Sequence, residues 1–482
     1  MDEPAMDLKT DLIQTITPEQ AWHYSILPKS KGNDVLEFFH ADRNDLAKIE
    51  ELEMLFGKRV VFHEVSIQMI KKHLSKYYLR NKDTSRHTNG QNKAIEGSSL
   101  KPNDFLLHLL EEANNLLCSD IHIESYESLS RIRFRIDGKL IERFIIRRDE
   151  YPALINKIKI LANLDIAEKR LPQDGRILLK SEEQTYDIRV SIIPSIFGEK
   201  IVLRLLRKTA SNINIRELGF DQNQFITFVE GLKKPNGIIL ISGPTGSGKT
   251  TTLYASLNIL NKTDINILTI EDPIEYTIEG INQVQLREDI GLTFAKALKT
   301  FLRQDPDIIM LGEIRDSETA QMAIRAALTG HLVLSTIHTN SAWGIVSRLI
   351  DMGIPPFLLS STLNMVVSQR LIRKLCPLCK REMSFDHKLF PIHVAPENRP
   401  ITHFIPVGCE HCHNTGFNGR IAVYEIINID QDMREMIRHS IDDANQKLKE
   451  KKIKQLYSSA LDYFLQGVTS LEEIAPILES NF

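Results

Sequence analysis

The amino-acid sequence predicts an α/β protein with a parallel sheet in its central part, preceded by an α+β domain and a small N-terminal domain. Two observations predict the parallel sheet. Short apolar runs at 237–242, 265–270, 307–311 and 331–336 alternate with helical patterns, as expected of strands that are covered on both faces. A glycine-rich segment of the kind that binds phosphate follows the first of these runs directly.

The length and composition limit the class of protein. A chain of 482 residues exceeds one ordinary core, so we expect two to four domains. The 60 basic and 63 acidic side chains nearly cancel, which argues against a protein that coats nucleic acid but leaves a local basic patch open. The chain lacks a secretory signal pattern and an apolar run of roughly 20 residues, the length that crosses a bilayer. We therefore expect a cytoplasmic protein that meets membranes through partners.

Changes in composition along the chain predict its division. A polar stretch without aromatic residues is typical of a flexible linker, because it cannot bury enough surface to offset its ordering entropy. After it, a helix starting near Asn103 or Asp104 and strands joined by an Asp137–Gly138 hairpin turn predict the α+β domain. The expected parts are an N-terminal docking domain (1–80), the linker (81–103), the α+β domain (104–207), a connector (208–219), the sheet domain (220–375), a cysteine-rich subdomain (376–417) and a mostly helical C-terminal part (418–482).

The segment at 243–251 reads GPTGSGKTT and fits the pattern G-x-x-x-x-G-K-[ST]. Its glycines let the backbone wrap a phosphate, towards which successive N–H groups and a helix N-terminus point. Lys249 would reach the β- and γ-phosphates of a nucleotide, and the Thr250 hydroxyl would hold Mg²⁺. A strand before the segment and an amphipathic helix after it disfavour an accidental glycine-rich turn. The residues expected to bind ATP are Gly243, Pro244, Thr245, Gly246, Ser247, Gly248, Lys249, Thr250 and Thr251.

Polar residues follow the other predicted strands. Glu271 and Asp272 come after the run at 265–270, Glu313 follows the next run, and His338 follows the last one. Ligands bind at the carboxyl ends of parallel strands, where a carboxylate can orient Mg²⁺ or the attacking water. Glu313 is our candidate for positioning the water. Taken singly, a carboxylate here is as consistent with a helix cap or a surface ion pair, and His338 with a hydrogen-bonded core histidine.

Four of the five cysteines form two C-x-x-C pairs, Cys376 with Cys379 and Cys409 with Cys412. Four thiolates can close a tetrahedral zinc site. His411 and His413 could replace a cysteine as ligands, and a redox pair or unrelated buried thiols are the alternatives to a metal. The fifth cysteine, Cys118, fits a core thiol.

Eight segments resemble the secretion ATPases of type II secretion and type IV pilus systems, the GspE/PilB-like family. Four resemble its Walker A, Asp box, Walker B and His box in that order: GPTGSGKTT (243–251), TIEDPIEY (269–276), LRQDPDIIMLGEIRD (302–316) and TGHLVLSTIHTNSA (329–342). Four more resemble its second N-terminal domain: SDIHIE (119–124), RLPQDGR (170–176), DIRVS (187–191) and GEKIVLRLL (198–206). The resemblance is strongest over about 104–430.

The resemblance implies a hexameric motor with a RecA-like ATPase domain and a smaller domain that moves against it. Glu313 would activate water, and the Asp box would place Glu271 and Asp272 near the metal. Mg²⁺ would then be held by Thr250, Glu313 and Asp272. Arg176 and Arg189 of the smaller domain would reach the γ-phosphate, although surface ion pairs are the plain alternative for both arginines.

Three further basic residues differ in the role that the resemblance implies for them. The family usually carries two arginines four residues apart before the Walker B strand, where this chain has Lys299 and Arg303. Lysine lacks the planar fork of a guanidinium, so we expect a catalytic role of Arg303 alone. For Arg204, an ion pair and a phosphate contact remain equally open.

The resemblance also implies a machine. The four cysteines match the zinc insertion of the family, which favours export or assembly over pilus retraction. We expect a cytoplasmic homo-hexamer, peripheral at a bacterial inner membrane, that uses ATP, Mg²⁺ and Zn²⁺ to power (pseudo)pilus assembly, with a platform protein and a cytoplasmic recruiter as partners. The short N-terminal domain slightly favours type II secretion over type IV pilus assembly. A DNA-uptake or conjugation ATPase and a non-enzymatic nucleotide-binding adaptor are the rivals, and nucleic acid is not an expected partner.

Overall fold

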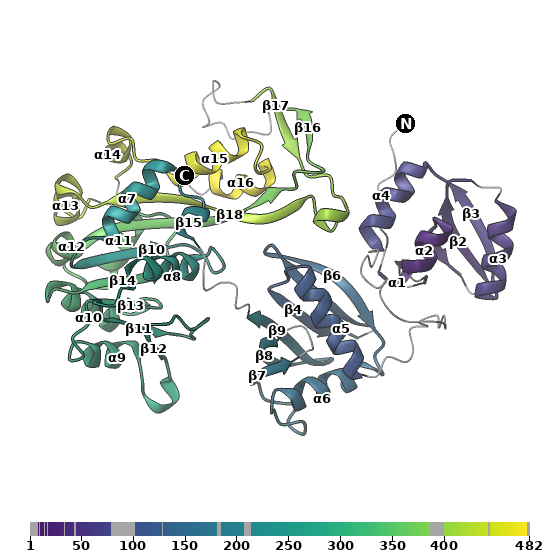
Figure 1. Ribbon diagram of the computed structural model, residues 1–482, viewed down its shortest axis with the longest axis horizontal. Coiled ribbons are helices and arrows are strands. Elements are labelled where there is room, and N and C mark those ends of the chain that lie inside the picture. The colour runs from purple at the N-terminus through teal and green to yellow at the C-terminus, as the bar shows by residue number, and fades with distance from the viewer. Residues whose placement is uncertain are drawn as a thin grey trace. The chain divides into compact units, whose positions relative to one another are not determined.

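A computed structural model shows the fold of the chain (Figure 1). It describes residues 8, 10–13, 15–16, 18–32, 34–42, 45–78, 102–127, 129–180, 185–206, 214–385, 400–441 and 444–479. The chain divides into two compact units. The first comprises 1–207 with the cysteine-bearing segments 376–381 and 406–418, and the second comprises 208–375, 382–405 and 419–482.

The N-terminal part of the first unit is a three-stranded sheet with helices. Strand β2 pairs antiparallel with β1 and parallel with β3, and alternate residues such as Leu36, Phe38 and Phe62 are buried. Asp45 accepts a hydrogen bond from the backbone of Lys48 and so caps helix α3. The elements are α1 (Thr10–Ile13), α2 (Pro18–Tyr24), β1 (Leu27–Lys31), β2 (Val35–His40), α3 (Leu46–Phe56), β3 (Arg59–Glu64) and α4 (Ile67–Tyr77).

The second part of this unit is the predicted α+β domain. Its six-stranded antiparallel sheet has the order β6-β5-β4-β9-β8-β7, and the core contains Leu109, Ile121 and Ile158. The predicted hairpin turn at Asp137–Gly138 is confirmed, with φ of 47° and 87°. The elements are α5 (Pro102–Asn115), β4 (Asp120–Ser125), β5 (Ser130–Ile136), β6 (Lys139–Ile146), α6 (Tyr151–Leu161), β7 (Gln173–Lys180), β8 (Thr185–Ser195) and β9 (Gly198–Leu206). The predicted linker lies outside the described residues, except for its last two residues, which belong to α5.

The second unit contains a seven-stranded sheet with the order β12-β11-β13-β14-β10-β15-β18. The pairs from β12 to β15 are parallel, which confirms the predicted fold class. Every residue of β10 is buried, because helices cover both faces of the sheet. The strands are β10 (Gly237–Ser242), β11 (Ile267–Glu271), β12 (Asn282–Gln285), β13 (Ile308–Leu311), β14 (Leu332–Ile337), β15 (Leu363–Leu375) and β18 (Phe417–Asn428). Helix α7 (Gln222–Leu232) precedes β10, and the helices between the strands are α8 (Lys249–Leu260), α9 (Phe294–Phe301), α10 (Ser317–Leu328), α11 (Gly344–Asp351) and α12 (Pro356–Thr362).

The end of the chain differs from the sequence-based expectation in one respect. The segment expected to open a mostly helical part contains β18, a strand of the central sheet beside β15. Its run from Ala422 to Ile427 is buried throughout, as in a strand covered on both faces. Helices follow only from Gln431. They are α13 (Gln431–Arg438), α14 (Asn445–Glu450), α15 (Leu456–Leu465) and α16 (Leu471–Glu479), and a small sheet of β16 (Arg381–Ser384) and β17 (Thr402–Ile405) precedes β18.

Candidate nucleotide site and zinc site

The predicted phosphate-binding loop connects β10 to α8. Gly243 and Gly248 have φ of 150° and 88°, which favours glycine at both positions. A Cβ on Gly243 would lie 2.4 Å from the carbonyl oxygen of Gln369, and one on Gly248 would lie 2.9 Å from the Gln369 Nε2. Gln369 also donates from Nε2 to the Ser247 carbonyl oxygen at 2.8 Å. The loop is therefore packed closely against Gln369, and its glycines leave no side chain in the way.

The N-terminus of α8 faces the same loop. Its N-cap, Gly248, offers no side-chain acceptor, so the first N–H groups of the helix are available to an anion. Lys249 Nζ donates to the carbonyl oxygens of Gly243, at 2.8 Å, and Pro244, at 3.1 Å. Burial lowers the pKa of Lys249, while the charge of Glu313 acts in the opposite direction. Thr250 is exposed on the first turn of the helix. The geometry is that of a phosphate cradle with a cation beside it.

The adjacent ends of β11, β13 and β14 bring three predicted site residues together. His338 Nε2 lies 3.6 Å from Glu313 Oε2. Arg315 Nη2 donates both to Glu313 Oε1 and to Asp272 Oδ2, the latter at 3.2 Å. The Glu313 side chain is 19% exposed, whereas those of Asp272, Arg315 and His338 are 39–53% exposed. These partly accessible charges lie where a metal or a water could be oriented.

Glu271 has different surroundings. It is buried, and its carboxylate accepts hydrogen bonds from Tyr254 Oη, from Thr269 Oγ1 at 2.7 Å and from Gln283 Nε2 at 3.0 Å. Burial, followed by the charge of Glu271, raises the pKa of Tyr254. The structure therefore shows Glu271 as an acceptor inside the sheet, and its predicted catalytic role stays a prediction.

Arg303 lies just after the helix that carries Lys299. Its Nη1 donates to the Lys299 carbonyl oxygen at 3.1 Å, and both residues are exposed. Nothing in this local contact assigns a catalytic role to either residue, so the expectation for Arg303 stays a prediction.

Three arginines of the α+β domain lie in one row across its sheet. Arg176 on β7 pairs with Arg189 on β8, which pairs in turn with Arg204 on β9. Arg176 makes a two-pronged ion pair with Asp187, and Arg204 Nε donates to Asp120 Oδ1 at 2.8 Å. Like charges directly opposite each other on a sheet are destabilising, so the row is consistent with binding an anion, and the carboxylates offset part of the repulsion.

Arg315, Gln369 and Arg370 lie at the site but were not predicted from the sequence. Arg315 could have been found, because it follows Glu313 by two residues in a segment already singled out. Gln369 and Arg370 carry no such signal, since they lie on β15, a strand that the sequence analysis did not predict. Arg370 Nη2 donates to the Asn340 carbonyl oxygen at 2.9 Å, and burial lowers the pKa of its guanidinium.

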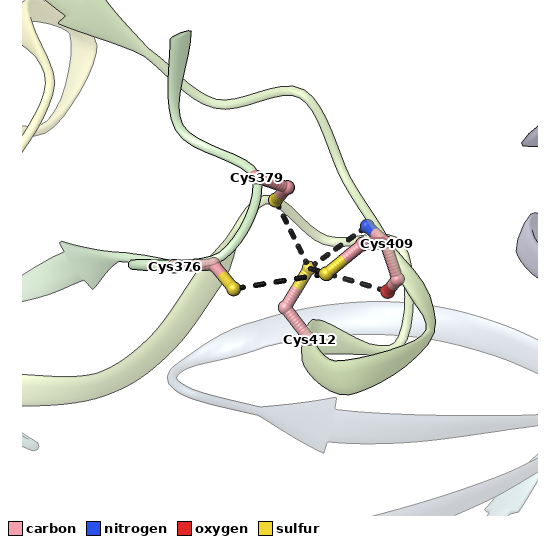
Figure 2. Close-up of side chains that lie close together, drawn as sticks. All are labelled: Cys376, Cys379, Cys409 and Cys412. Carbon is pink, nitrogen blue, oxygen red and sulfur yellow. Dashed lines mark hydrogen bonds between the residues drawn. The ribbon is translucent and has the colours of Figure 1, made fainter.

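The four predicted zinc ligands converge (Figure 2). The Sγ atoms of Cys376 and Cys409 are 3.8 Å apart, those of Cys379 and Cys412 are 3.7 Å apart, and those of Cys409 and Cys412 are 3.7 Å apart. Four sulfurs at about 2.3 Å from a tetrahedral zinc ion would lie about 3.8 Å from one another. The spacing of the sulfurs therefore fits zinc.

Backbone N–H groups support the same four sulfurs. Gly408 N donates to Cys379 Sγ at 3.3 Å, and Gly416 N donates to Cys412 Sγ at 3.3 Å, contacts that orient thiolate ligands. Burial raises the pKa of the Cys379 thiol, and a bound zinc ion would act in the opposite direction by stabilising the thiolate. Of the alternative ligands, His411 lies 2.9 Å from Asn418 Nδ2 through its Nε2. Cys118 is buried elsewhere and donates to the Asp120 carbonyl oxygen, as predicted for a core thiol.

Comparison with known protein families shows which family the chain belongs to. Residues 98–476 match the family described as "Type II/IV secretion system protein", and residues 1–83 match the MshEN domain. The chain belongs to the Type II/IV secretion system protein family. This result confirms the resemblance inferred from the sequence and places the chain among the secretion ATPases, whose nucleotide-binding domain implies ATP and Mg²⁺.

Individual relatives come from both kinds of machine. The chain is 41% identical over 495 residues to the type IV pilus assembly ATPase PilB of Myxococcus xanthus, with 97% of this chain and 87% of the relative covered. It is 46% identical over 377 residues to the type II secretion system ATPase E of Vibrio cholerae, with 77% of this chain and 74% of the relative covered.

A solved structure of the pilus retraction motor PilT with bound ADP is also similar, with 26% identity, a TM-score of 0.53 and coverage of 80% of this chain and 97% of that chain. The Legionella pneumophila ATPase DotB, at 23% identity, has a TM-score of 0.60 and the same coverage, and supports the fold. Within the described part of the chain, no helix combines the length and the apolar character needed to span a membrane.

Proposed function

We propose that this secretion ATPase hydrolyses ATP at the loop formed by residues 243–251 to drive assembly of a pilus-like filament at a bacterial inner membrane. The observation that carries this proposal is the convergence of Glu313, Asp272 and His338 at one edge of the sheet that also presents the phosphate cradle. A partly accessible carboxylate beside the cradle is the group that hydrolysis needs to orient and deprotonate a water molecule.

The chain's own groups would divide the chemistry. Backbone N–H groups of the loop and Lys249 would bind the β- and γ-phosphates. Thr250, Asp272 and Glu313 would hold Mg²⁺, which would supply positive charge beside the transferring phosphoryl group. Glu313 orients the attacking water and accepts its proton, since a carboxylate beside the cradle can act as a general base.

The arginines and the oligomer extend the proposal. Arg176 and Arg189 would stabilise charge on the γ-phosphate once the α+β domain meets the nucleotide site of a subunit, and Arg303 would act in the same way. A homo-hexamer would bring these groups together. The N-terminal domain would bind the machine's recruiter or its inner-membrane platform protein.

Turnover assays on the full chain test the enzymatic proposal. Lys249→Ala and Glu313→Gln should each lower phosphate release by about 100-fold or more, because the first removes the phosphate-binding cation and the second removes the base. Lys262→Ala is the matched control, since this exposed lysine follows the opposite end of α8. Normal turnover by Glu313→Gln would exclude Glu313 as the base, and normal turnover by Lys249→Ala would exclude this ATP site.

Type II secretion and type IV pilus assembly remain the two candidate machines. Type II secretion was slightly favoured from the sequence, and coverage by relatives does not separate the two machines. The M. xanthus pilus ATPase aligns over 97% of this chain, but the pilus ATPase PilB of Pseudomonas aeruginosa aligns over 77%, as does the V. cholerae secretion ATPase. Deleting the gene and restoring it with wild type or Lys249→Ala would separate them, because loss of surface pili supports the pilus role and loss of an exported enzyme supports secretion.

We also propose that the four cysteines hold a structural zinc ion. Metal analysis of the purified chain should find about one zinc per chain, and Cys376→Ser should lower both zinc content and thermal stability, because a metal that binds only the folded state stabilises it. Cys118→Ser is the matched control, since Cys118 is also buried but lies outside the cluster. Full zinc content in Cys376→Ser would contradict the four-cysteine assignment.

A further inference from the structure

A buried glutamate on an outer strand of the central sheet connects two segments that are distant in sequence. Glu425 lies on β18 and is only 4% exposed. Its Oε1 accepts a hydrogen bond from Ala342 N at 3.0 Å, and its Oε2 accepts one from Leu456 N at 3.1 Å. Burying a carboxylate costs free energy unless it is hydrogen-bonded, so both hydrogen bonds stabilise the buried side chain. One carboxylate thus ties the loop after β14 to the start of α15.

The first of these segments carries His338. The loop from His338 to Ala342 is held at its far end by Glu425 and in its middle by Arg370, which donates to the Asn340 carbonyl oxygen. Within the loop, Thr339 Oγ1 donates to the Ser341 carbonyl oxygen at 2.9 Å, which stiffens the loop internally. His338 itself is half exposed and lies 3.6 Å from Glu313. The position of His338 beside Glu313 therefore depends on a loop whose far end, at Ala342, is fixed by Glu425.

The second segment is the N-terminus of α15. Its N-cap residue, Gln455, makes no side-chain capping hydrogen bond. Glu425 on β18 instead supplies the acceptor for the Leu456 N–H in the first turn of the helix. Leu456 and Ala460 of α15 pack in one core with Ile474 of α16 and with Ile372 and Val423 of the central sheet. A displacement of these C-terminal helices would therefore be transmitted to the carboxylate.

We propose that Glu425 is a positioning residue that holds His338 against Glu313 and couples helices α15 and α16 to ATP hydrolysis. The inference rests on the proposed function, in which Glu313 acts on the attacking water. Its chemistry is specific, because a carboxylate offers an acceptor to each of the two N–H groups, whereas an amide of the same size offers only one.

The first test is kinetic. Glu425→Gln should lower kcat by about tenfold, because a shifted loop misplaces a group beside the reacting atoms, while KM for ATP should change by less than about twofold, since the phosphate cradle is untouched. Ser459→Ala is the matched control. Ser459 is also buried and joins α15 to β18 by donating to the Tyr424 carbonyl oxygen at 2.9 Å, but this contact does not involve the loop, so turnover should stay within about twofold of wild type.

A double-mutant cycle then asks whether Glu425 acts through His338. In a His338→Gln background, Glu425→Gln should lower kcat by less than about a further twofold, because coupled residues show non-additive effects. A further tenfold loss in that background, or an equal loss in Ser459→Ala, would overturn the proposal. The failure of the proposed function would be seen separately, as normal turnover in Lys249→Ala.

Hydrogen–deuterium exchange on the wild-type chain provides a test that needs no variant to fold. Binding of a non-hydrolysable ATP analogue should change the exchange of amides at 342–346 and at 456–460 together. A change confined to the first of these segments would show that α15 is not coupled to the site and would overturn the proposal.

Discussion

Glu271 and Glu313 both stand at the carboxyl ends of neighbouring parallel strands, yet their surroundings differ. Glu271 is the last residue of β11 and still pairs with Gln285 of β12, so its side chain stays among Tyr254, Thr269 and Gln283. Glu313 comes two residues after the end of β13, where the backbone has left the sheet and the side chain reaches the edge. A carboxylate at a strand end is therefore a site candidate only when it lies beyond the last paired residue.

The largest expected effect is on ATP turnover, which should fall more when Glu313 is replaced than when Glu271 is replaced. Relative to the loss of about 100-fold expected for Glu313→Gln, Glu271→Gln should retain at least about a tenth of wild-type turnover, because its carboxylate lies inside the sheet. Phosphate release under saturating ATP measures both variants. Equal losses in the two would show that Glu271 also takes part in the chemistry, as the sequence analysis expected.

The free energy of unfolding should fall more in Glu271→Gln than in Glu313→Gln, which is the reverse of the order expected for turnover. Glu271→Gln places an NH₂ group where the carboxylate now accepts hydrogen bonds, and leaving a buried partner unsatisfied costs about 1–3 kcal/mol. Tyr254→Phe removes one donor to Glu271 and the acceptor of the Glu275 N–H, which lies 3.3 Å from Tyr254 Oη, so it should also lower the free energy of unfolding. Urea unfolding followed by circular dichroism measures these changes, with Glu313→Gln as the reference that should unfold near the wild-type midpoint.

A buried carboxylate of the α+β domain should make the stability of the protein depend on pH. Glu124 contacts Arg131, Arg133 and Lys200. Burial alone would raise its pKa, but hydrogen bonds and charge from these cations outweigh it and lower the pKa to about 2. Because the pKa is depressed in the folded state, the stabilisation is complete above the unfolded value of about 4.3 and is lost as pH falls towards 2.

The matched variant for this prediction is Glu124→Gln, which carries no charge at any pH. Its unfolding midpoint should lie below that of wild type at pH 6, and the gap should narrow progressively as the pH is lowered below about 4.3. A gap that stays constant down to the lowest pH at which the protein folds would contradict the assignment of these ion pairs.

The smallest expected effect concerns Arg315, which contacts both Glu313 and Asp272. Arg315→Gln should lower turnover by about three- to tenfold, because it removes an exposed partner that orients the carboxylates without removing the base itself. Steady-state kinetics measures the change. Arg325→Gln, in the last turn of α10, is the control and should leave turnover unchanged.

The sequence by itself determined the features that depend on local pattern. The glycine spacing of 243–251 predicted a backbone loop that binds phosphate, and the apolar run at 237–242 predicted a strand buried on both faces. The C-x-x-C pairs predicted a set of four metal ligands. In each case the chemistry is encoded by residues a few positions apart, so no distant contact is needed to recognise it.

The tertiary structure alone decided which of the candidate polar residues meet. Gln369 and Arg370 reach the nucleotide-site loops only because β15 pairs beside β10, and Glu425 reaches Ala342 only because β18 joins the same sheet after the intervening cysteine-rich segment. Glu271 and Glu313 read alike in the sequence and differ in burial. Long-range pairing sets burial and hydrogen-bond partners, and these quantities determine whether a carboxylate supports the sheet or is free to act at its edge.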